Sequence, residues 1–206
     1  MTGDELPPIG WGPPGVTRGA DDNARFAASF DLMTAVLNGT RLPDLLTLLA
    51  THARTMARVP LAFIAMPVED GNTLRIEVAV GSDGDRIRGL MVRRGRSMLG
   101  RAFSSRRALS ARIAADQTLS ALPAGPILIL PLDTGEDTRG VLAVLGHPGA
   151  QPFSPATARQ LLLFADMSAR LIELAEGHRA TAPADPAAGG AHIVRPLRPP
   201  PRFTQM

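Results

Sequence analysis

Residues 125–145 read GPILILPLDTGEDTRGVLAVL, and this stretch decides the fold. Two apolar runs of strand length flank a polar turn at residues 133–137, which is the pattern of a β-hairpin. Both runs are apolar almost throughout, so the hairpin is expected at the centre of a sheet.

Helical and extended patterns alternate on both sides of this hairpin. Before it, helices are predicted over residues 24–37 and 40–57. The other elements predicted before the hairpin are strands at 61–68, 74–80, 90–94 and 109–114, a loop at 81–84, a short helix at 97–107, and a short helix or turn at 116–122. After the hairpin, Ser154 and Pro155 provide an N-cap and a first-turn proline for a helix that runs to about residue 176. This order predicts an α/β (α+β) domain with a mainly antiparallel sheet.

The first and last helices carry apolar stripes. In the first helix, Phe26, Phe30, Met33 and Leu37 form one face. The stripe predicted for the last helix consists of Leu161, Phe164, Met167 or Ser168, Leu171 and Leu174, with Leu162, Leu163 and Ile172 lying off it. The last helix is thus apolar over more than one face, which predicts a second buried face and a homodimer through the first and last helices.

Three local phrases resemble those of bacterial GAF domains. They are GRSMLGRAF at 95–103, PILILPL at 126–132 followed by RGVLAVL at 139–145, and Phe153-Ser154 before the last helix. The resemblance covers about residues 24–176 and is closest to the sensory GAF domains of actinobacterial-type two-component histidine kinases. It implies a GAF-like central antiparallel sheet of about six strands, with the N- and C-terminal helices on one face. Short crossover helices on the other face can enclose a small-molecule pocket in this family.

Composition divides the chain into three parts. Residues 1–21 and 179–206 are rich in Pro, Gly or Ala, which predicts a disordered leader and a disordered Pro/Ala/Arg-rich tail around a GAF-like sensory domain at 22–178. No run of 18 apolar residues and no basic, apolar N-terminal signal occur in the sequence. These features predict a cytoplasmic protein without a membrane span.

The residue inventory argues against several chemistries. The chain has no cysteine, which excludes thiolate metal sites and disulfides. Among the activities that the resemblance implies, bilin attachment and reduction of free methionine sulfoxide both need a cysteine. Of the cyclic-nucleotide signature, only Phe153 matches, and residues 119–126 lack the histidine of the haem-binding subgroup. Haem and bilin are therefore disfavoured as cofactors.

Four histidines, at 52, 147, 178 and 192, show no metal-ligand spacing, so no metal site is predicted. Neither GSDG at 81–84 nor GRSMLG at 95–100 is a nucleophile elbow or a phosphate loop. We therefore expect a non-catalytic protein rather than an enzyme.

All 22 basic residues are arginine, against 19 acids. Nine arginines and no acid lie between residues 86 and 115, so a basic segment sits within a mildly acidic protein. Arginine can bind a carboxylate or phosphate through two parallel hydrogen bonds. The segment is interpreted as a solvated face, as a site for an anionic ligand or acidic partner, or, least favoured, as a nucleic-acid surface.

Two functions remain open. The first is a sensory or regulatory GAF domain that binds a small ligand and signals through a dimeric helix bundle to a separate output protein such as a histidine kinase. The second is a pocketless GAF fold that serves as a dimerisation and protein-interaction module. The candidate ligand-binding residues are Phe63, Met91, Arg93, Met98, Phe103, Arg112, Ile113, Asp116 and Leu119, with Gln117 beside them. The two functions differ in whether the apolar members of this set line a cavity or pack together.

Overall fold

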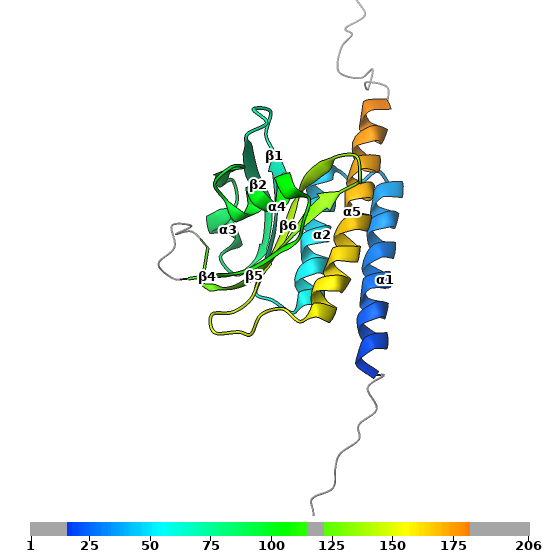
Figure 1. The fold of residues 1–206 in the computed structure, drawn as a ribbon. Helices are drawn as coiled ribbons and strands as arrows, with labels where there is room; N and C mark the ends of the chain where they lie inside the picture. Colours follow the sequence, from blue (N-terminus) through cyan, green and yellow to red (C-terminus); the bar gives the residue numbers. More distant parts are fainter. Residues whose placement is uncertain (1–15, 115–121, 182–206) are drawn as a thin grey trace, which may run out of the picture.

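The computed structural model describes residues 16–114 and 122–181 of the 206-residue chain. Within these residues, six strands form one antiparallel sheet in the order β3-β2-β1-β6-β5-β4 (Figure 1). The strands are β1 (Leu61–Pro67), β2 (Thr73–Gly81), β3 (Met91–Arg93), β4 (Leu109–Ile113), β5 (Gly125–Asp133) and β6 (Thr138–Leu145). The predicted fold class is confirmed.

The β5–β6 hairpin lies inside the sheet, as its sequence predicts. Its pairing runs from Ile127 opposite Leu145 to Leu132 opposite Gly140. Strand β1 covers the other edge of β6, with Leu61 opposite Leu145. Nearly every residue of β5 and β6 is buried, because side chains on both faces of the sheet are covered by helices.

One face of the sheet is covered by α2 (Leu42–Ala57) and α5 (Pro155–Thr181). The helix α1 (Val16–Leu37) packs on α2 and α5 and forms an outer layer (Figure 1). Fully buried side chains join these layers, among them Leu32 of α1, Leu49 of α2 and Phe164 of α5. We call this apolar set the helix-side core.

The apolar stripe of α1 points outward. Phe26, Phe30, Met33 and Leu37 are each at least 50% exposed, whereas Ala28, Leu32 and Val36 on the opposite side are buried. The helix therefore has two apolar faces, and periodicity alone does not tell which of them packs inside. Helix α1 also begins at Val16, earlier than the predicted start at residue 24.

The predicted cap of α5 is confirmed, but its stripe is only partly correct. The Ser154 hydroxyl accepts a hydrogen bond from the Thr157 N–H at 3.1 Å, and Pro155 opens the helix. Leu174, predicted inside the stripe, is 44% exposed, whereas Ile172, predicted off it, is fully buried. The physical reason is that α5 packs against the sheet, α2 and α1 at once, so that its buried arc is wide.

The other face of the sheet is covered by two short helices, α3 (Gly84–Ile87) and α4 (Met98–Ser105). Helix α3 begins at the end of the predicted loop and is not among the predicted elements. The element predicted at 116–122 falls almost entirely outside the described residues. No described helix combines the length and apolar character that crossing a membrane requires.

Candidate functional site

The face beneath α3 and α4 is an apolar cluster, which we call the crossover-side core. Four of the predicted ligand-binding residues meet there. Phe63, Phe103 and Ile113 are buried, and Met98 packs against them with its side chain half-buried. The other buried members are Leu61, Ala65, Leu74, Ile76, Ala79, Ile87, Leu99, Ala102, Ile127, Ile129, Val141, Ala143 and Leu145. These side chains contact one another as a packed core.

The other described candidates lie on the two edges of the sheet. Met91 and Arg93 are exposed on β3, at one edge. Arg112 is exposed on β4, at the opposite edge, and donates a hydrogen bond to the Ala150 carbonyl oxygen at 2.6 Å. Asp116, Gln117 and Leu119 lie outside the described residues. Ligand binding by this set stays a prediction.

Helix α4 is fixed at its N-terminus by local geometry. The Ser97 hydroxyl accepts a hydrogen bond from the Gly100 N–H at 2.9 Å, which caps the helix. A Cβ on Gly100 would lie 2.0 Å from the Arg94 carbonyl oxygen, so only glycine permits this approach of helix to backbone. The segment at 95–103, one of the three that resemble bacterial GAF domains, therefore contributes to the packing of α4 in this chain.

Arg94 covers part of the crossover-side core. Its guanidinium carbon lies 3.9 Å from the centre of the Phe103 ring, a cation–π contact. It also donates a hydrogen bond to the Gly71 carbonyl oxygen in the β1–β2 turn. The sequence did not single out Arg94, because it is one of nine arginines in the segment and the contact joins residues far apart in the chain.

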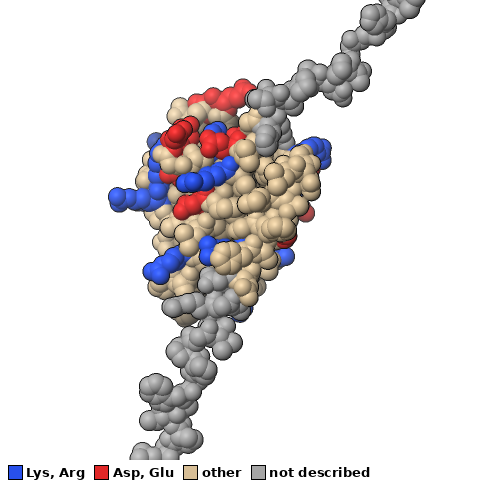
Figure 2. Space-filling model, turned by 90° about the vertical axis from the view of Figure 1, so that its right-hand side faces the viewer, with Lys and Arg blue, Asp and Glu red and all other residues tan. Residues whose placement is uncertain are grey.

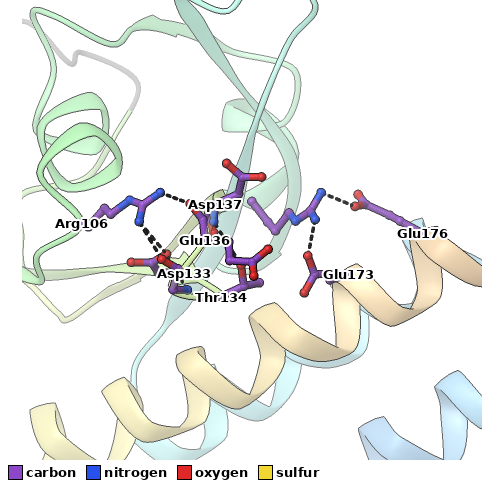
Figure 3. Close-up of polar contacts among 9 residues, drawn as sticks. Arg106, Asp133, Thr134, Glu136, Asp137, Glu173 and Glu176 are labelled. Atoms are coloured by element: carbon purple, nitrogen blue, oxygen red, sulfur yellow. Dashed lines mark hydrogen bonds and ion pairs between the residues drawn. The ribbon is translucent and has the colours of Figure 1, made fainter.

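Arg106 joins the end of α4 to the β5–β6 turn (Figure 3). It is the C-cap residue of α4 and adopts a left-handed backbone conformation with φ 55° and ψ 31°. Its guanidinium donates hydrogen bonds to the carbonyl oxygens of Gly135, at 3.0 Å, and Glu136. The Asp133 carboxylate lies 3.9 Å away.

Arg139 joins the beginning of β6 to α5. Its guanidinium contacts Glu173 at 2.5 Å and Glu176 at 3.2 Å, two carboxylates one helical turn apart (Figure 3). The hydrogen bond to Glu173 raises the pKa of Arg139, and the charges of both glutamates add to this. The β5–β6 turn is therefore connected to helices on both faces of the sheet.

The remaining arginines of the basic segment divide into two groups. Arg86 pairs with Asp83 at 3.5 Å, and Arg88 donates to the Ala79 carbonyl oxygen at 3.5 Å. Four others are exposed and have no ion-pair partner within the described part of the chain: Arg93, Arg96, Arg101 and Arg107.

His52 lies between helices rather than in a metal site. Its Nε2 is 3.4 Å from the Asp31 carboxylate of α1. Burial lowers the pKa of His52, and the Asp31 charge opposes this only in part. Over residues 16–114 and 122–181, no three His, Asp or Glu side chains gather as a metal-binding group.

A sequence profile of the GAF domain matches residues 41–173. The chain belongs to the GAF domain family. The second GAF domain of DevS from Mycobacterium smegmatis is 26% identical, with a TM-score of 0.59, and the match covers 66% of this chain and 96% of that one. The family predicted from the sequence is thereby confirmed.

More distant GAF folds extend the comparison. The GAF domain of a phosphoenolpyruvate-protein phosphotransferase from Coxiella burnetii is 14% identical, with a TM-score of 0.63 over 77% of this chain and 99% of that one. Free methionine-R-sulfoxide reductase from Neisseria meningitidis is 13% identical, with a TM-score of 0.64 over 80% and 95%. At these identities the likeness shows the fold alone. GAF domains are commonly sensory or regulatory, although the reductase shows that the fold also carries an enzyme.

Proposed function

We propose that this GAF domain is a non-catalytic regulatory protein of signal transduction, working without a resident cofactor. It binds a small ligand and signals as a homodimer, through its first and last helices, to a separate output protein such as a histidine kinase. The observation that carries the proposal is the outward apolar face of α1, formed by Phe26, Phe30, Met33 and Leu37.

This face has the spacing of a helix–helix seam. Its four residues follow one another at intervals of four, three and four, which is the alternation of a heptad repeat. Figure 2 looks onto the side of the molecule where α1 lies, and a broad area of it is free of charged side chains. Full burial of one large apolar side chain is worth about 1.5–3 kcal/mol, so four such residues from each of two copies would provide a strong drive to associate.

The mass of the full chain in solution tests this assembly. We expect the wild-type protein to be a dimer by light scattering after size-exclusion chromatography, and Phe30→Glu to be a monomer with an unchanged circular dichroism spectrum. Met91→Glu is the matched control, because Met91 is 62% exposed but lies on the edge strand β3. A monomeric wild type, or a dimer that Phe30→Glu leaves intact, would contradict the proposal.

A pocketless interaction module is the second candidate function. The packing of Phe63, Phe103 and Ile113 in the crossover-side core favours it, because a ligand-binding sensor requires these candidate residues to line a cavity. Under this alternative the dimer remains and the ligand is dispensable.

A thermal-unfolding panel separates the two candidates. Cyclic nucleotides, other nucleotides, haem and small carboxylic acids are the compounds to test. A ligand at 100 times its dissociation constant adds about 2.7 kcal/mol of stability, which is a shift of several degrees at this chain length. A shift lost in Arg93→Ala or Arg112→Ala supports the sensor, and a flat panel favours the interaction module.

A further inference from the structure

The β5–β6 turn lies between two helices that occupy opposite faces of the sheet. Helix α4 belongs to the crossover-side core through Leu99, Ala102 and Phe103, whereas α5 belongs to the helix-side core. We propose that this turn is a mechanical link that transmits displacement of α4 to α5, through Arg106 on one side and Arg139 on the other. The inference rests on the proposed regulatory function, and it names the residues through which a change on the crossover side reaches the helices.

The α4 side of the link is a short, direct connection. Arg106 directly follows α4, so its position is set by the last turn of that helix. Its guanidinium donates to the carbonyl oxygens of both Gly135 and Glu136, and two such bonds from one planar group fix direction as well as distance. A shift of the C-terminal end of α4 must therefore move the turn or break both bonds.

The turn itself holds together as one piece. The Gly135 N–H donates to the Asp133 carboxylate at 3.1 Å, and the Thr134 N–H donates to the Asp137 carbonyl oxygen at 3.0 Å. The Asp137 N–H in turn donates to the Thr134 hydroxyl at 3.2 Å. The Thr134 hydroxyl also donates to the Asp137 carbonyl oxygen at 3.1 Å. These internal hydrogen bonds across five residues favour motion of the turn as a rigid unit over local deformation.

The α5 side of the link is an ion-pair fork. Arg139 stands two residues after the turn, on β6, and contacts Glu173 and Glu176 together. The Arg139 side chain is 28% exposed and its partners Glu173 and Glu176 are 42% and 34% exposed, so the fork is a partly exposed ion pair that gains its definition from two carboxylates on one guanidinium. Figure 3 shows the three parts in sequence, from Arg106 through the turn to the two glutamates on α5.

Amide hydrogen exchange on the full chain, without any ligand, tests the link. We expect Arg106→Gln to speed exchange of the amides around residues 173–176 of α5 by about threefold or more, relative to the amides of α2. Arg101→Gln is the matched control, because Arg101 is an exposed arginine on α4 without a partner among the described residues. A general loss of stability would speed exchange in α2 and α5 alike. The ratio of the α5 rate to the α2 rate therefore reports only the effect that the link carries to α5. Faster exchange confined to α4 and the turn would overturn the proposal.

A double-mutant cycle gives a second, independent readout. Arg106 and Glu173 do not contact each other in the structure. If the two residues act separately, the change in the unfolding equilibrium constant of the double variant should equal the product of the changes in the two single variants. We expect Arg106→Gln and Glu173→Gln together to depart from that product by about threefold or more, and agreement within about twofold would overturn the link. If Arg106→Gln does not fold, Arg106→Lys replaces it, because lysine keeps the charge but loses the planar fork. Neither measurement depends on a ligand or a dimer, so failure of the link and failure of the proposed function can be told apart.

Discussion

Replacement of Phe63 by alanine tests whether the crossover-side core is tightly packed or contains a cavity. Phe63 is fully buried on β1, within the crossover-side core. If its ring is surrounded by packed side chains, truncation costs about 3–5 kcal/mol, the transfer free energy of the ring plus the cost of the cavity. At about 2–4 °C per kcal/mol for a chain of this length, the unfolding midpoint should fall by roughly 6–20 °C.

The assay is thermal unfolding followed by circular dichroism, with Met91→Ala as the control. Met91 was also a predicted site residue, but its side chain is mostly in water, so its truncation should change stability by about 0.5 kcal/mol at most. A loss below about 1 kcal/mol in Phe63→Ala would refute the packed-core reasoning, because it would mean that the ring borders a space holding few partner atoms.

Three further outcomes follow from single positions. Gly100→Ala should destabilise the fold by about 1–3 kcal/mol in urea unfolding, because the new methyl meets the Arg94 backbone, and a gain in stability from the better helix propensity of alanine would contradict this. Burial lowers the pKa of His52, so the unfolded chain takes up a proton near pH 6.5 while the folded one stays neutral. Stability should therefore fall as the pH drops below about 6.5, until the pH passes the folded pKa, and His52→Gln should flatten this decline in unfolding midpoints measured from about pH 7.5 to about pH 5. Partial desolvation raises the pKa of Asp166, and the nearby Asp133 charge adds to this, so the carboxylate is less stable in the folded state than in the unfolded chain. Asp166→Asn should raise the midpoint slightly at pH 7 and leave it unchanged below about pH 3.8, and an equal effect at both would count against a charge origin.

Much of the fold could be predicted from local patterns. The hairpin at 125–145 and the strand at 74–80 can each be recognised from their own sequence. A strand that is covered on both faces is apolar at every position, and a strand that is covered on one face is apolar at every second position. The helix cap at Ser154 is equally local. By contrast, the orientation of α1 depends on which of its two apolar faces meets α2 and α5, and no window of its own sequence contains that information.

The candidate site could be predicted only in its apolar part. Phe63, Phe103 and Ile113 come together because each belongs to an element whose inward face is readable from periodicity. The polar contacts escaped prediction for a different reason. Arg106 reaches Gly135, and Arg139 reaches Glu173, across sequence separations that only the assembled sheet closes.

The sheet order also constrains how this chain reaches its native state. Strand β1 pairs on one side with β2, its neighbour in sequence, and on the other side with β6. The pairing of Leu61 with Leu145 therefore cannot form until β6 is present. Until the second half of the domain is available, the wholly apolar run from Leu61 to Ala65 is an open strand edge, the kind of surface that pairs with other chains. Pairings of such large sequence separation slow folding through the entropy of closing long loops. During synthesis, the N-terminal half therefore cannot complete its sheet until β6 has left the ribosome. Fragments that stop before β6 should aggregate instead of folding.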